Sequence, residues 1–222
     1  MKKFLIIAHS ANHYFRLAEF LDKKKLLKKI ISIYPKFKLK DYSISNNKIK
    51  FLFFPFMVFC LRRFLKIKLS NIFYSKVFNT FCKIHIKKSE EKKILIGLNG
   101  YCLDSIKSAK KKGFLTIVDR ACPHINIQKQ IIYNELDKLP VLHSNKIKKN
   151  YFDQKIVDQM LMEYDNCDLI SVPSSFTIDS FKKFNFDKKI LLNQITPEKV
   201  LQINKSQNIS DPSFKIFSIG FN

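Results

Sequence analysis

Short apolar runs recur along this chain, and segments with helical spacing separate them. The runs are Phe4–Ala8, Ile30–Tyr34, Ile49–Phe54, Ile94–Leu98, Phe114–Val118, Leu169–Val172 and Ile190–Leu192. Most are continuous rather than alternating, which is typical of strands buried on both faces of a parallel sheet. Strands that alternate with helices indicate the α/β class. We therefore expect a Rossmann-like, doubly wound, mostly parallel sheet with helices on both faces.

Between these runs, apolar residues recur at intervals of three and four, as on the buried face of a helix. A first helix is expected from about His13 to Asp22, and a second after Pro123. A third carries the apolar stripe within Ile156–Tyr164. A fourth begins after Ser174 or Ser175, because either hydroxyl is well placed to cap it.

Polar residues follow three of the apolar runs. His9 and Ser10 follow the first, Asn99 and Gly100 follow the fourth, and the segment Asp119–His124 follows the fifth. Open α/β sheets bind their ligands at the carboxyl ends of the strands. The sequence therefore predicts a ligand cleft along this edge.

The side chains at this edge suit a ligand that carries hydroxyls or phosphate. The carboxylate of Asp119 can orient a hydroxyl or accept its proton, and the imidazole of His124 can do the same near neutral pH. The guanidinium of Arg120 can hold a phosphate, and an open backbone at Gly100 would let a ligand approach closely. An alternative stays open, in which Asp119 caps the next helix, Arg120 is its salt-bridge partner and His124 is a hydrogen-bonded turn residue.

The chain is strongly basic, with 41 Lys and Arg against 18 Asp and Glu and a formal charge of +23. An A+T-rich coding sequence would explain this excess of lysine, and so would an anionic partner such as a membrane surface or a phosphorylated ligand. Proteins that read nucleic acids rely on arginine for bidentate contacts, but this chain has few arginines and no recognisable nucleic-acid-binding motif. We expect no specific nucleic acid partner.

The run Phe51–Leu61 is strongly apolar and precedes Arg62 and Arg63. A helix needs about 20 apolar residues to span a bilayer, and this run is shorter and contains a proline. It is therefore not expected to cross a membrane. Two interpretations remain: a strand followed by a helix packed on the core, or a basic aromatic helix that lies in the membrane interface.

Several classes of site are not supported by the sequence. The five cysteines are widely spaced, which is typical of reduced thiols in a cytosolic protein, and no Cys-x-x-Cys pair indicates a metal site. Neither the Gly-x-Gly-x-x-Gly pattern nor the P-loop pattern occurs. We expect a cytoplasmic protein, either free or peripheral on the inner face of the membrane, with no metal and no cofactor.

The last part of the chain differs from the rest. Residues 194–213 are polar and contain two prolines, which predicts a linker, and Phe214–Gly220 has the pattern of a buried strand that ends in glycine. We expect residues 1–193 to form one domain. Residues 214–222 would then be the first strand of a second domain that this chain does not contain.

Two segments resemble the family-4 glycosyltransferases of bacteria. Asp119–Glu135 is similar to the turn and helix that follow the family's fifth strand, and Glu163–Ser180 is similar to a later stretch in which Cys167 replaces the usual alanine. Phe214–Gly220 is similar to the first strand of the family's second domain. The likeness covers most of residues 95–222, and it covers residues 1–90 only by the order of elements.

This resemblance implies a GT-B fold, in which two Rossmann-like domains face a cleft, and it makes this chain the acceptor-side domain. The implied activity is retaining transfer of a sugar from a nucleotide-sugar donor to a glycan or lipid-linked acceptor, as in the synthesis of cell-envelope polysaccharides. The candidate catalytic residues are Asp119 and His124, and the candidate substrate-binding residues are His9, Ser10, Asn99, Gly100 and Arg120.

We expect this chain to lack the donor-binding half and to be inactive alone, either as a truncated enzyme or as one half of a split enzyme whose donor-binding half is a separate chain. The competing hypothesis is a non-catalytic basic protein that binds an anionic membrane surface or nucleic acid.

Overall fold

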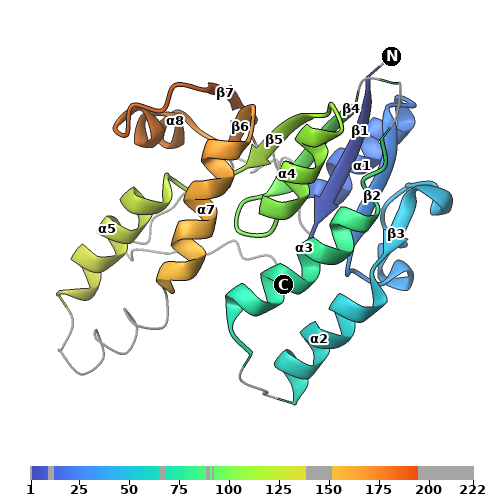
Figure 1. The fold of residues 1–222 in the computed structure, drawn as a ribbon, viewed down its shortest axis with the longest axis horizontal. Coiled ribbons are helices and arrows are strands. Elements are labelled where there is room, and N and C mark those ends of the chain that lie inside the picture. Colours follow the sequence, from blue (N-terminus) through green and yellow to red (C-terminus); the bar gives the residue numbers. More distant parts are fainter. Residues whose placement is uncertain are drawn as a thin grey trace, which may run out of the picture.

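The computed structural model describes residues 2–9, 13–65, 69–88, 91, 93–138 and 152–194 (Figure 1). The strands are β1 (Lys3–Ala8), β2 (Leu27–Ser32), β3 (Ile49–Phe51), β4 (Lys93–Leu98), β5 (Leu115–Asp119), β6 (Leu169–Val172) and β7 (Lys189–Leu192). The helices are α1 (His13–Lys23), α2 (Phe53–Phe64), α3 (Asn71–Ile84), α4 (Leu103–Lys111), α5 (Ile125–Leu136), α7 (Gln154–Asn166) and α8 (Ser175–Lys182), with short 3₁₀ turns η1 (Lys36–Leu39) and η2 (Asn46–Lys48).

The strands form one sheet in the order β3-β2-β1-β4-β5-β6-β7, and every neighbouring pair is parallel. From β1 the chain moves outward to β2 and β3, and it then crosses back to β4 on the other side of β1. The predicted Rossmann-like, doubly wound α/β fold is therefore confirmed. The order reverses between β1 and β4, and their carboxyl ends meet where sheets of this type bind ligands.

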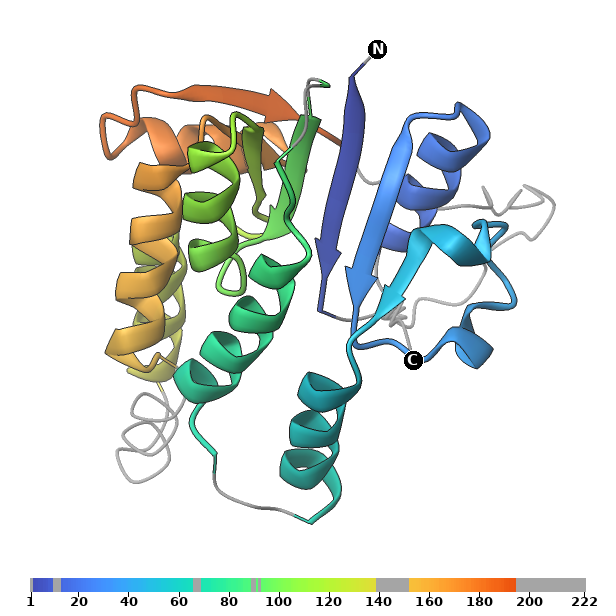
Figure 2. The same cartoon turned by 45° about the vertical axis from the view of Figure 1, so that its right-hand side comes forward.

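Both faces of the sheet are packed. On one face, Leu5 and Ile7 of β1 share a core with residues of α3, α4 and α7, such as Phe78. On the other face, Ile6 and Ala8 pack in a core with α1. Figure 2 shows α3, α4 and α7 in front of the sheet and α1 behind it. Alternate residues of β1 are thus buried on opposite faces, which explains its continuous apolar sequence.

Two predicted strands differ from the structure at their ends. The second was expected at Ile30–Tyr34, but β2 covers Leu27–Ser32 because it pairs with β1 from its first residue. The third was expected at Ile49–Phe54, just before Pro55, but β3 ends at Phe51 and Pro55 lies in the first turn of α2. Proline is tolerated there because the first N–H groups of a helix have no partner within it. Neither α3 nor α4 is among the individually predicted helices.

Helix α2 is only partly buried. Pro55 and Val58 are buried against the core, as the first interpretation of this segment predicts. An apolar stripe faces solvent, however, because Phe53 is 66%, Met57 41% and Phe64 73% exposed. Within the described residues, no helix has the length and apolar character needed to cross a membrane.

Three sequence-based predictions lie outside the described residues. They are the position of Ser10, the linker from residue 195 onward, and the strand Phe214–Gly220. They stay predictions.

Candidate functional site

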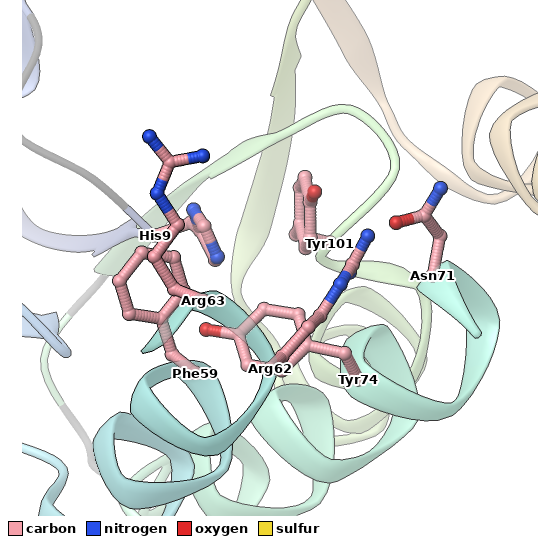
Figure 3. Close-up of a pocket in the computed structure, with 7 residues that line it drawn as sticks. All are labelled: His9, Phe59, Arg62, Arg63, Asn71, Tyr74 and Tyr101. Carbon is pink, nitrogen blue, oxygen red and sulfur yellow. The ribbon is translucent and has the colours of Figure 1, made fainter. Parts of the chain in front are cut away.

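A cavity of about 330 Å³ lies at the reversal point of the sheet (Figure 3). We call it the switch-point cavity. It is lined by His9, Phe59, Arg62, Arg63, Asn71, Tyr74 and Tyr101. His9 follows β1 and Tyr101 follows β4, whereas the other lining residues come from α2 and α3. One wall is thus the carboxyl edge of the sheet, and the other is the helical crossover between β3 and β4.

Aromatic contacts fix the imidazole of His9. Its ring stacks on Tyr101, with centroids 4.5 Å apart and an angle of 22° between the planes. The rings of Tyr74 and Phe78 meet it edge-on at 5.1 and 5.7 Å. A ring enclosed in this way keeps one orientation, so its nitrogen atoms hold defined positions in the wall of the cavity.

Two buried polar atoms in this wall have no hydrogen-bond partner within the described part of the chain: His9 Nε2 and Tyr74 Oη. Tyr74 is 2% exposed. Buried polar groups in folded proteins are nearly always hydrogen-bonded, so these two atoms indicate a ligand or water at the cavity. Burial, together with the positive charge of Arg62, lowers the pKa of His9 to about 4. The imidazole is therefore neutral at pH 7, and a ring nitrogen can accept or donate according to its tautomer.

Arg62 and Arg63 bring two positive charges to the cavity. Arg62 is half-buried and Arg63 is exposed, and neither makes a hydrogen bond or ion pair among the described residues. In the view of Figure 3, Arg63 lies next to His9, and Arg62 lies between Tyr74 and Tyr101. No carboxylate lines the cavity within the described residues.

Behind Tyr101, a buried carboxylate organises the loop after β4. Glu163 of α7 is fully buried, and it accepts hydrogen bonds from the backbone N–H groups of Gly100, Cys102 and Leu103 at 2.5, 3.0 and 3.1 Å. The side-chain amide of Asn99 donates to the same carboxylate at 2.8 Å. Glu163 thus caps the start of α4 and joins α7 to it.

Burial raises the pKa of Glu163 to about 7, although the surrounding donors favour its charged form. Five donors converge on it when Gln159 Nε2 is included at 3.2 Å, and a protonated carboxyl would turn one O–H toward N–H groups. The carboxylate therefore holds the loop that carries Tyr101 in place.

We expected an open backbone at Gly100, but this residue is buried. Its carbonyl oxygen accepts hydrogen bonds from Ser75 Oγ at 2.8 Å and from Gln159 Nε2 at 2.7 Å. It has a φ of +90°, a conformation that favours glycine. The glycine is needed for the turn, and a direct role in binding stays a prediction.

The guanidinium of Arg120 is occupied by groups of the same chain. It donates to the carbonyl oxygen of Pro123 at 3.0 Å, to Asn99 Oδ1 at 3.3 Å and to Gln128 Oε1, and it is only 6% exposed. Tyr164 Oη donates to the same Asn99 oxygen at 3.1 Å. Arg120 and Asn99 therefore tie the loop after β5 to the loop after β4.

Asp119 ends β5 in a buried position and has two aromatic partners. Tyr14 Oη donates to Asp119 Oδ2 at 2.8 Å, and His13 Nε2 lies 2.8 Å from the same oxygen. The alternative in which Asp119 caps the next helix and pairs with Arg120 is wrong for the described residues, because His124 occupies the cap position. The two partners come from α1, so Asp119 joins α1 to the sheet.

His124 is also enclosed. Its Nδ1 accepts from the backbone N–H of Asn126 at 3.3 Å, and its ring stacks on Phe184 with centroids 4.2 Å apart. Burial, with the positive charge of Arg120, lowers its pKa to about 4. This helix-cap geometry matches the turn role that the sequence left open, and a catalytic role for His124 stays a prediction.

The structure therefore brings only His9, of the described candidate residues, to the lining of the cavity. Asn99, Gly100 and Arg120 lie in the hydrogen-bonded loops behind it. Sequence reasoning missed Arg62 and Arg63 as site residues, although two adjacent arginines in a chain that otherwise uses lysine were a usable signal. It had no signal for Asn71, Tyr74 and Tyr101, which come from unpredicted helix α3 and from the loop after β4.

No protein-family model matches this chain, and no curated protein sequence matches it. Among the described residues, no three His, Cys, Asp or Glu side chains lie together as metal ligands would.

Proposed function

We propose that this chain is the acceptor-side domain of a glycosyltransferase of the family-4 type, and that the sugar acceptor binds in the switch-point cavity. One observation carries the proposal: the cavity opens at the reversal of a doubly wound sheet, and its wall holds the unpartnered atoms His9 Nε2 and Tyr74 Oη. Ligands bind at this edge in open α/β sheets. The nucleotide-sugar donor would bind to a second domain, as the resemblance implies.

The chemistry of the lining suits a sugar. Sugar hydroxyls need partners that donate and accept hydrogen bonds, and the imidazole of His9, the amide of Asn71 and the hydroxyl of Tyr74 are such groups. The rings of Phe59 and Tyr101 offer apolar surface for the carbon skeleton. In this proposal His9 contacts the acceptor, and the loops held by Glu163 and Arg120 position the wall.

Saturation-transfer NMR on the 222-residue chain tests the proposal. We expect methyl α-D-glucopyranoside to bind with millimolar affinity. UDP-glucose should bind no more tightly than the nonspecific attraction between an anion and a basic chain explains. Tyr101→Ala should abolish glucoside binding because it removes the ring that stacks on His9. Phe176→Ala, which truncates an exposed aromatic residue of α8, is the matched control and should bind as the wild type does.

Two outcomes would contradict the proposal. If no neutral glycoside in a panel of common pyranosides binds to the wild-type chain, the cavity is not an acceptor site. If the chain alone transfers sugar at a robust rate, it is not the acceptor half of a larger enzyme.

A second candidate function, binding to an anionic membrane surface, is favoured by the apolar stripe of α2. Phe53, Met57 and Phe64 recur on one side of this helix and face solvent, in a chain with a formal charge of +23. A helix with an exposed aromatic face and nearby cations is typical of proteins that lie in the membrane interface. A peripheral position would also bring a lipid-linked acceptor to the cavity.

Co-sedimentation with vesicles tests this second candidate. We expect binding to vesicles of phosphatidylglycerol and phosphatidylcholine, and weak binding to phosphatidylcholine alone. Phe53→Ser with Phe64→Ser should weaken binding by about a hundredfold or more, since each buried aromatic side chain contributes roughly 1.5–3 kcal/mol. Phe37→Ser with Phe176→Ser removes two equally exposed phenylalanines elsewhere and should leave binding unchanged. Equal loss in both double variants would contradict a specific role for α2.

A further inference from the structure

The switch-point cavity combines features that a neutral sugar does not explain. Arg62 and Arg63 line it, and neither has a hydrogen-bond or ion-pair partner among the described residues. No carboxylate lines the cavity within the described residues, and Glu163, whose charge acts on Tyr101, is fully buried and already accepts hydrogen bonds from five donors. The positive charge of the arginines is therefore not balanced from within the cavity.

The charge of Arg62 is directed at the cavity. The same guanidinium lowers the pKa of His9 and acts on the pKa values of Tyr74 and Tyr101 in the direction that favours their charged forms. His9 and Tyr101 lie at the carboxyl edge of the sheet, and Tyr74 lies on α3. Arg62 lines the same cavity as these three side chains, so its charge faces the space that a ligand would occupy.

We propose that the switch-point cavity binds a phosphate group, with Arg62 and Arg63 as its cationic ligands and with Tyr74 Oη and His9 Nε2 as hydrogen-bond partners. Arginine binds phosphate through its planar fork of N–H donors. Tyr74 supplies a second, independent indication, because its hydroxyl is buried at the cavity and has no partner within the described part of the chain.

Phosphate fits this arrangement better than carboxylate. A carboxylate has two oxygens, and one arginine fork occupies both. A phosphate monoester has three terminal oxygens, so it can accept from two guanidinium groups and from a hydroxyl at once. Neutral His9 adds one further hydrogen bond without adding charge.

The cavity also has room for more than the phosphate. Its volume of about 330 Å³ lies at the lower end of the range for small-molecule sites. The aromatic rings of Phe59 and Tyr101 and the amide of Asn71 remain for the rest of the ligand. We therefore expect a phosphorylated molecule whose second part is about the size of one sugar ring. That this molecule is the acceptor rests on the proposed function, whereas phosphate binding rests on the cavity alone.

Isothermal titration with α-D-glucose 1-phosphate as the probe tests the proposal, and methyl α-D-glucopyranoside serves as its neutral counterpart. We expect the phosphorylated probe to bind more tightly than the neutral one. Arg62→Gln with Arg63→Gln should weaken its binding by about 30-fold, which corresponds to ~2 kcal/mol. Tyr74→Phe should weaken it several-fold while circular dichroism shows an unchanged fold.

The matched control is Lys24→Gln with Lys38→Gln. Both lysines are exposed, and this pair lowers the formal charge from +23 to +21, as the arginine pair does. A very basic chain attracts any anion, so a loss of affinity in the arginine variant alone does not show a site. A site is shown only if the arginine double variant loses more affinity for glucose 1-phosphate than the lysine double variant does. We expect the control to keep its affinity for glucose 1-phosphate within about twofold, as for a distant screened charge.

A second probe, dihexanoyl phosphatidic acid below its micelle-forming concentration, distinguishes a soluble phosphorylated ligand from a lipid headgroup. Binding of glucose 1-phosphate alone supports a soluble ligand, and binding of the lipid alone supports a headgroup; both depend on the arginines if the proposal is right. Equal losses in the arginine and lysine pairs, or no binding of either probe, would overturn it. If the glucoside binds but neither phosphorylated probe does, this inference is overturned and the proposed function stands. If a phosphorylated probe binds but no neutral glycoside does, the proposed function is overturned and this inference stands.

Discussion

Replacing Gly97 by alanine tests how closely β4 packs against the start of α4. A Cβ atom added to Gly97 would lie 2.6 Å from Cys102 Cβ and 3.0 Å from Cys102 Sγ. The first distance is about 0.8 Å short of 3.4 Å, where ordinary van der Waals contact begins. Cys102 is fully buried, and its Cβ is fixed to the backbone just before α4. The clash can therefore be relieved only if the strand and the helix move apart.

Overpacking of a core typically costs about 1–3 kcal/mol. Because the closer of the two atoms, Cys102 Cβ, is fixed to the backbone and cannot rotate away, we expect Gly97→Ala to lower the free energy of unfolding by about 2–3 kcal/mol. Urea titration followed by far-UV circular dichroism measures this change, and an unchanged slope would show that the same two states are compared. The loop between β4 and α4 carries Tyr101, so ligand binding at the switch-point cavity should weaken in the same variant.

Two further variants identify the cause. Cys102→Gly removes the clashing Cβ, so the double variant should lose less stability than the two single changes added together. Gly113→Ala has nothing within 4 Å of the added Cβ and meets only the cost of a positive φ, +77°, about 1–2 kcal/mol. The packing argument is refuted if Gly97→Ala is as stable as the wild type, or if Cys102→Gly brings no relief.

Three other predictions concern single side chains. Since the pKa of His9 is about 4 in the folded state, stability is full above pH 6.5 and falls toward pH 4; urea titrations from pH 7 to 4 should show the wild type losing up to about 3 kcal/mol relative to His9→Leu. Burial raises the pKa of Glu163 to about 7, so its contribution to stability is present at low pH and is lost as the pH rises. Between pH 5 and pH 8 the wild type should therefore lose up to about 3 kcal/mol of stability relative to Glu163→Gln, and parallel curves of stability against pH would contradict this. Ser174 Oγ accepts from the backbone N–H of Thr177 at 3.3 Å, so Ser174→Ala should cost about 1 kcal/mol in thermal or urea unfolding, whereas Ser175→Ala should be nearly neutral.

The strands were the most predictable part of the fold. All seven apolar runs are strands of the sheet, because a parallel strand buried on both faces must be apolar throughout. The predicted ends of β2 and β3 are wrong because hydrophobicity alone does not set where a strand begins or ends. Lys28 and Lys29 belong to β2 although they are charged, since pairing with β1 extends the strand to Leu27. Pro55 lies in the first turn of α2 rather than just after a strand.

The site was less predictable because its two walls have different origins. Reading the strand ends selected His9, which follows β1 and which the structure places in the lining of the switch-point cavity. The same reasoning selected Asp119, Arg120 and His124, which the fold instead encloses with Tyr14, Asn99 and Phe184. The position of a residue at a strand end does not reveal whether its polar group is already bonded within the protein, since the bonding partners are far away in the sequence.

The second wall of the cavity belongs to the crossover between β3 and β4. Helix α2 presents three different surfaces there: Val58 to the core, Arg62 to the cavity and Phe64 to solvent. Because the arginines and the apolar stripe lie on different sides of one helix, binding of soluble phosphate and binding of membranes should be separable. Arg62→Gln with Arg63→Gln should lose glucose 1-phosphate yet keep most vesicle binding, and Phe53→Ser with Phe64→Ser should do the reverse. If either pair abolished both activities, α2 would act as a single unit, and the assignment of its two faces to different ligands would be wrong.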